Sequence, residues 1–150
     1  MKGCLTIAVI LALVLAGVYF FINSTETIDQ ELHGMMYTID NTLEVDIVVH
    51  LSGELEDPFF ADPTFQGNIR IEGEDVFLEQ TIQDTTVADE GVYIVINKER
   101  ANGEIVSGHL ALSKELDAII GSVQENGNGI EYYFGAPGNS IDDILQIEIP

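Results

Sequence analysis

The chain has 150 residues and is strongly acidic, with 26 Asp and Glu against five Lys and Arg and a formal net charge of −21. A charge of this sign repels nucleic acid and anionic lipid headgroups. It therefore excludes nucleic acid as a partner and leaves a protein partner or a cationic ligand. Cys4 is the single cysteine, so the chain has no internal disulfide and its folded part must be held by its core.

The N-terminal stretch Cys4–Ile22 is 19 residues long and carries no charged side chain. A helix of this length spans about 28 Å, close to the hydrocarbon thickness of a bilayer, so the stretch predicts a transmembrane helix with the lipid bilayer as partner. Lys2 precedes it and acids follow it, which predicts a single-pass protein of the cell membrane with a cytoplasmic N-terminus and its C-terminal domain outside. A secretory signal cleaved after Ala16 is the less favoured alternative.

These features divide the chain into three parts. Residues 1–23 are the predicted membrane anchor or uncleaved signal, 24–34 a juxtamembrane linker, and 35–150 an acidic extracytoplasmic β-domain. Ser24–His33 is polar, begins with residues suited to an N-cap and has acids in its first turn. It predicts a short juxtamembrane helix or stalk.

Beyond the linker the hydrophobic pattern changes to the alternation that is typical of strands. Thr42–Leu51 places aliphatic side chains on one face and mostly acids with His50 on the other, which predicts a half-buried strand. Gly91–Lys98 is apolar on both faces and is expected at the centre of a sheet. Further strands are predicted at Phe65–Gly73, Val76–Ile82, Glu104–Leu112, Asp117–Gln124 and Ile130–Phe134.

Turn and cap residues complete the predicted fold. Asn102-Gly103 and the run Asn126–Gly129 suit tight turns between strands. Ser140 predicts the N-cap of a short helix over Ile141–Gln146, with two aspartates in its first turn. The pattern indicates a mainly β fold, an antiparallel sandwich or partly open barrel with a short C-terminal helix, preceded by one N-terminal transmembrane helix. An α+β arrangement with Lys114–Gly121 helical is the alternative.

Ser52–Thr64 is predicted as a loop that is broken by two Asp-Pro pairs. Two adjacent rings in it, Phe59 and Phe60, either tuck under the sheet, which is the favoured interpretation, or form an apolar tip that contacts a partner. An exposed acidic loop is favoured over a metal site, so no cofactor is predicted, and a weakly bound calcium ion is the alternative. The weak candidates for calcium ligands are Glu54, Glu56, Asp57 and Asp62.

The sequence contains no motif that predicts a catalytic residue. It has no glycine-rich phosphate loop, paired CxxC, HExxH, GxSxG elbow or EF-hand spacing. His33, His50 and His109 share no metal-ligand spacing, and His50 and His109 are expected to face water from strands. Ser107 and His109 share one face of a predicted strand but lie about 7 Å apart along it, so they are weak evidence for a nucleophile and its base.

Two segments carry a resemblance to a known group of proteins: the strand Phe65-Gln-Gly67-Asn-Ile69-Arg-Ile71-Glu-Gly73 and the closing Gly135-Ala-Pro137-Gly-Asn-Ser140. With the apolar N-terminus they resemble uncharacterised small single-pass membrane-anchored β-rich proteins of Gram-positive bacteria. In those proteins an F-x-G-x-I-x-I-x-G strand precedes an Ala-Pro turn and a short acidic helix. The resemblance extends over about Leu43–Gln146, with Gly138 where alanine is expected. It implies location and fold, and no catalytic residue.

One anchor, one compact acidic domain and no catalytic motif predict a membrane-anchored extracytoplasmic binding or accessory module of unknown specificity. The alternatives are a hydrolase that uses carboxylates or a bound cation and a calcium-dependent surface module.

Overall fold

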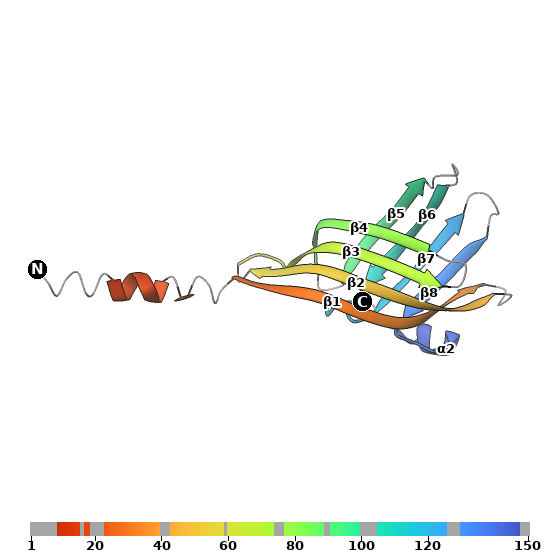
Figure 1. The fold of residues 1–150 in the computed structure, drawn as a ribbon, viewed down its shortest axis with the longest axis horizontal. Coiled ribbons are helices and arrows are strands. Elements are labelled where there is room, and N and C mark those ends of the chain that lie inside the picture. The colour runs from red at the N-terminus through yellow and green to blue at the C-terminus, as the bar shows by residue number, and fades with distance from the viewer. Residues whose placement is uncertain are drawn as a thin grey trace, which may run out of the picture.

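A computed structural model describes residues 9–15, 17–18, 23–39, 43–58, 60–73, 77–88, 91–99, 105–125 and 130–147. In this part of the chain, eight antiparallel strands form one nearly closed, barrel-like sheet, followed by a short helix (Figure 1). The elements are β1 (Asn23–Thr38), β2 (Glu44–Pro58), β3 (Thr64–Gly73), β4 (Phe77–Thr86), β5 (Val92–Glu99), β6 (Ile105–Leu112), β7 (Ile119–Glu125), β8 (Glu131–Ala136) and α2 (Ile141–Ile144). The predicted mainly β fold with a short C-terminal helix is confirmed.

The strand order is β4-β3-β2-β1-β8-β7-β6-β5, with β1 as the link between two halves. β1 pairs with β2 over Asn23–Tyr37 and with β8 over Met35–Thr38. Figure 1 shows β1–β4 running along the long axis of the molecule, with β5–β8 crossing behind them at a steep angle. The sheet therefore curls back on itself, and its inner face encloses the core.

The predicted strand at Phe65–Gly73 is confirmed as β3, and its alternation has a physical reason. Phe65, Ile69 and Ile71 are fully buried on the inner face. A Cβ added at Gly67 would lie 2.8 Å from Cζ of the Phe65 ring, and one at Gly53 of β2 would lie 2.9 Å from Cε2. The ring therefore packs over a cross-strand pair of glycines and fills the barrel interior there.

Two predictions at the start of the sheet are wrong. Ser24–His33 forms neither a helix nor a stalk, because it belongs to β1 and pairs residue by residue with β2. The predicted loop at Ser52–Thr64 is shorter than expected, because β2 continues to Pro58 opposite Asn23. In both segments, pairing with a neighbouring strand overrides the local preference of polar residues.

The prediction that Gly91–Lys98 lies at the centre of the sheet is also wrong. β5 is the last strand in the sheet order and pairs with β6. Its inner residues Val92 and Ile96 are buried, whereas Tyr93 and Val95 on the outer face are 59% and 80% exposed. The apolar outer face therefore belongs to the surface of the molecule, which a single sequence does not distinguish from a second buried face.

The α+β alternative is wrong as well, because Lys114–Gly121 forms a turn and then enters β7. Ser113 stabilises this turn: its hydroxyl donates to the Asp117 carboxylate at 2.7 Å and accepts from the main-chain N–H of Ala118 at 3.0 Å.

Residues 9–15 and 17–18 are helical, and their Val, Ile and Leu side chains are exposed. Within the described residues, no helix has both the length and the apolar character needed to cross a membrane. The remainder of Cys4–Ile22 lies outside the described residues, as do the predicted Asn-Gly turns at 102–103 and 126–129.

Candidate functional site: a groove on the outer face

The helix α2 packs against the outer face of the sheet and forms one end of the site. Its predicted N-cap is confirmed: the Ser140 hydroxyl accepts a hydrogen bond from the Asp143 N–H at 3.2 Å, and the Asp143 carboxylate accepts from the Asn139 N–H at 3.1 Å. A Cβ added at Gly135 or Gly138 would lie 2.6 Å from the side chain of Ile144. These glycines therefore let Ile144 pack closely, and it is buried.

Beside α2 lies a groove with a volume of about 350 Å³. One row of cross-strand neighbours runs through it, from His109 on β6 and Ser122 on β7 to Tyr133 on β8 and Tyr37 on β1. Residues after α2 close one end. Aromatic and aliphatic side chains predominate among the lining residues, which are Tyr37, Tyr93, His109, Ala111, Ile120, Gly121, Ser122, Tyr133, Phe134, Ile144, Leu145 and Ile147.

Two tyrosines form one wall of the groove. The ring centroids of Tyr37 and Tyr133 are 5.8 Å apart and their planes differ by 25°, so the rings stack. Stacked rings of this kind favour each other's orientation and present a flat apolar surface. A flat ligand group can lie against this wall.

A chain of hydrogen bonds lies beside this wall. The Ser122 hydroxyl donates to Glu131 at 3.0 Å, and the His109 Nδ1 lies 3.5 Å from the same hydroxyl oxygen. A hydrogen bond to Glu131 raises the pKa of Tyr133 above its ordinary value of 10.0, and the negative charge of Glu131 acts in the same direction. Tyr133 therefore stays a neutral phenol at physiological pH.

The order of these groups suits ligand binding better than nucleophilic catalysis. Activation of a serine requires a histidine base that is itself oriented by an acid. Here Ser122 lies between His109 and Glu131, so the acid bonds to the hydroxyl and not to the imidazole. Ser107 and His109 share β6 as predicted, but the residue opposite His109 on β7 is Ser122.

Sequence reasoning missed most of the groove. Tyr37, Ser122 and Tyr133 come from three strands, and their register appears only when the strands pair. The one available signal is the alternation of the last strand, which places Glu131 and Tyr133 on the same face.

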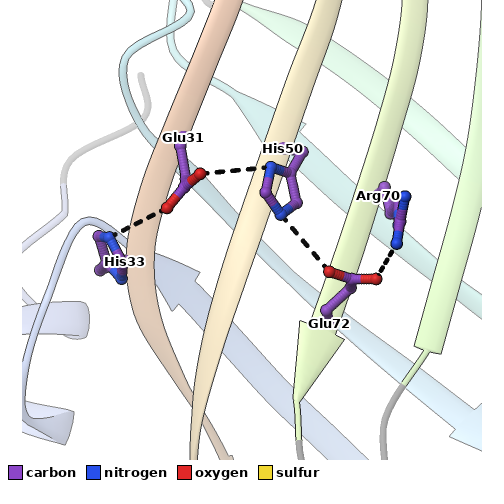
Figure 2. Close-up of polar contacts among 5 residues, drawn as sticks. All are labelled: Glu31, His33, His50, Arg70 and Glu72. Atoms are coloured by element: carbon purple, nitrogen blue, oxygen red, sulfur yellow. Dashed lines mark hydrogen bonds and ion pairs between the residues drawn. The ribbon is translucent and has the colours of Figure 1, made fainter.

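A second polar cluster crosses the outer face of β1, β2 and β3 (Figure 2). Glu31 lies 3.4 Å from Nε2 of His33 and 3.7 Å from Nδ1 of His50. Nε2 of His50 lies 3.5 Å from Glu72, which also forms an ion pair with Arg70. We call these five residues the histidine–carboxylate ladder. Its side chains are well exposed, so water and salt screen its interactions.

The ladder brings together two histidines that are far apart in the sequence, because Glu31 of β1 lies opposite His50 of β2. His50 does face water as predicted, as does His109 in the groove. Among the described residues, no three His, Cys, Asp or Glu side chains are grouped so that they could hold a metal ion.

The predicted calcium ligands do not share one loop. Glu54, Glu56 and Asp57 lie on β2, and Asp62 lies in the turn that follows. Glu54 and Glu56 share a face by the alternation of the strand, and Asp57 points to the opposite face. Glu54 lines a shallow hollow of about 480 Å³ that Asp84 also lines. Calcium binding by these residues stays the untested alternative to an exposed acidic segment.

Of the two predicted partner-contact rings, Phe60 is 88% exposed in the turn after β2, so the expectation that it tucks under the sheet is wrong. Phe59 lies outside the described residues. Phe60 therefore lies where a partner can reach it.

No protein-family model, curated protein or solved structure matches this chain.

Proposed function

We propose that the protein is a membrane-anchored binding module that acts outside the cytoplasm, and that its groove binds a neutral, largely apolar group that carries a hydrogen-bonding atom. The observation that carries this proposal is the lining of the groove. In a chain with 26 acids, none of the described residues that line it is an Asp or Glu.

The size and chemistry of the groove support a small ligand group. A volume of about 350 Å³ is within the range of small-molecule sites, which combine apolar walls with a few polar groups. The Tyr37–Tyr133 wall supplies the apolar surface, and Ser122 and His109 supply the polar atoms. A carboxylate on the ligand would meet the repulsive field of the acidic chain.

A matched pair of probes tests this proposal. We expect the full chain in mild detergent to bind 2-naphthol and to reject 2-naphthoate, as followed by NMR shifts of the groove amides. Leu145→Glu places a carboxylate on a lining residue that is 68% exposed, and should abolish the shifts. Ile39→Glu adds the same charge at a residue that is 80% exposed outside the groove, and should preserve them. Equal binding of both probes, or equal effects of both variants, would contradict the proposal.

The membrane anchor and its orientation are supported by the apolar stretch Cys4–Ile22 and the flanking charges. The exposed apolar side chains of residues 9–15 and 17–18 are of the kind that lipid covers. The single cysteine permits a direct test with a membrane-impermeant maleimide on intact cells. We expect Cys4 to stay unlabelled, and the thiol of Asp142→Cys in a Cys4→Ser background to react. Labelling of Cys4 would contradict the orientation.

A calcium-dependent surface module is the second candidate, because Glu54 and Asp84 line the same hollow. A cation that binds only the native state must raise the thermal midpoint. We therefore propose unfolding the full chain with and without millimolar calcium, with Glu54→Gln as the variant. An unchanged midpoint would dismiss this candidate.

A further inference from the structure

The two end strands of the sheet, β4 and β5, face each other without pairing along most of their length. Among the described residues β4 pairs with β3 and β5 pairs with β6, and a bridge between Ala88 and Gly91 joins the two only at their connecting turn. Figure 1 shows the two strands running in different directions. One edge of each strand therefore presents main-chain groups that no described strand pairs with, and such edges are templates for another strand.

A hollow of about 420 Å³ lies between these edges. We call its lining residues the seam; they are Glu79, Gln80 and Thr81 of β4 with Asn97 and Lys98 of β5. None of them lines the groove beside α2, so the seam is a separate site.

Lys98 spans the seam. By the alternation of β5 it shares the inner face with Val92 and Ile96, which are buried. Its ammonium donates to the main-chain carbonyl of Glu79 at 2.8 Å. A pairing strand would use this type of acceptor, and an inward charge on an edge strand is a known device against unwanted pairing. Lys98 thus occupies a main-chain acceptor that an added strand could use.

We propose that the seam accepts an extended basic peptide, which pairs with the main chain of β5 and displaces Lys98 from the Glu79 carbonyl. Strand addition takes its affinity from main-chain hydrogen bonds and its specificity from alternate side chains. The net charge of −21 attracts a basic peptide, and Glu79 and Glu99 add local negative charge at the two strands. Alternate apolar residues of the peptide would contact Val95 on the outer face of β5, which is 80% exposed and lies outside the groove.

The net charge also favours a basic peptide over a second copy of the chain as the added strand. Two copies that join through β5 would each bring a charge of −21, so their repulsion opposes the pairing. A basic peptide gains from the same charge.

The test uses the full chain in mild detergent and a capped peptide of alternating lysine and valine, matched to the eight residues of β5. We expect the peptide to slow the exchange of the seam-facing amides of β5 by about tenfold or more, because pairing protects main-chain N–H groups. A peptide with the same charges but N-methylated at every residue has no main-chain N–H on either edge to donate, and should give no protection.

Lys98→Met and Lys114→Met form a matched pair of variants, because each removes one positive charge. Lys98→Met also removes the competing donor, so the alternating peptide should bind it severalfold more tightly than it binds Lys114→Met. Equal binding of the N-methylated peptide, equal affinities of the two variants, or protection spread over all strands would overturn the proposal. Protection of β5 that rises with protein concentration in the absence of peptide would overturn it in favour of a second copy.

Discussion

Phe65→Ala tests whether the interior of the barrel is filled. The side chain is fully buried, and substitutions of this kind cost about 3–5 kcal/mol. The cost depends on how far the neighbours can collapse into the cavity. Beneath the ring lie Gly53 and Gly67, which have no side chains to move, so we expect a loss of about 4–5 kcal/mol. That is a large fraction of the about 5–15 kcal/mol that holds a typical domain together.

The assay is urea unfolding of the full chain in mild detergent, followed by far-UV circular dichroism because the chain has no tryptophan. Phe60→Ala is the matched control, since the same atoms are removed from an exposed ring and the change should stay within about 0.5 kcal/mol. Adding Gly67→Ala should not refill the cavity, because its Cβ would lie 2.2 Å from the Ser52 carbonyl oxygen. Equal losses for Phe65→Ala and Phe60→Ala would show that the Phe65 ring does not fill the barrel interior.

Three further predictions concern the outer face. Glu131→Gln should lower the pKa of Tyr133 towards its ordinary value, as measured by alkaline difference absorbance, because it removes the charge that raises that pKa. A tyrosine whose pKa is raised by folding favours the native state while it is protonated, so stability is lost as the pH rises through the raised pKa. Glu131→Gln should therefore lose less stability than the unchanged protein over this pH range. Identical tyrosine titrations of the two proteins would contradict this expectation. Ser140→Ala should destabilise the N-terminal end of α2 by about 1 kcal/mol, because it removes the capping hydroxyl, and the Ile144 amide should exchange faster. Unchanged exchange would argue against a stabilising cap. Arg70→Met should cost less than about 1 kcal/mol in urea unfolding, because the ion pair is exposed, and a larger loss would show that the ladder supports the fold.

The sequence predicts the elements with a clear period of two. Ile47, Val49 and Leu51 are buried as their alternation requires, and the helix cap at Ser140 follows from local chemistry. The misses depend on partners far along the chain. Ser24–His33 looks helical until β2 supplies a partner for it.

The candidate site was less accessible to prediction. A groove formed by three or more strands depends on cross-strand register, and no local pattern in the sequence encodes the row from His109 to Tyr37. The ladder is a similar case, because Glu31 and His50 are brought together by the pairing of β1 with β2. Sequence reasoning named only candidates that are conspicuous within one segment, such as the acids and the two adjacent phenylalanines near Pro58.

The filled interior has a consequence for where the protein can act. Phe65, Phe134 and the aliphatic residues of the inner face occupy the space that larger barrels leave for a ligand, so recognition must use the outer face or the edges. The outer face is divided: the charged ladder crosses β1–β3, whereas the groove over β5–β8, with Tyr37 from β1, is lined mainly by tyrosines and aliphatic side chains. Exposed apolar surface costs solubility, and a chain with a charge of −21 tolerates it because its acids keep the rest of the molecule solvated. The charge therefore lets the protein present an apolar groove to water and, under the proposed function, would repel acidic competitors from it.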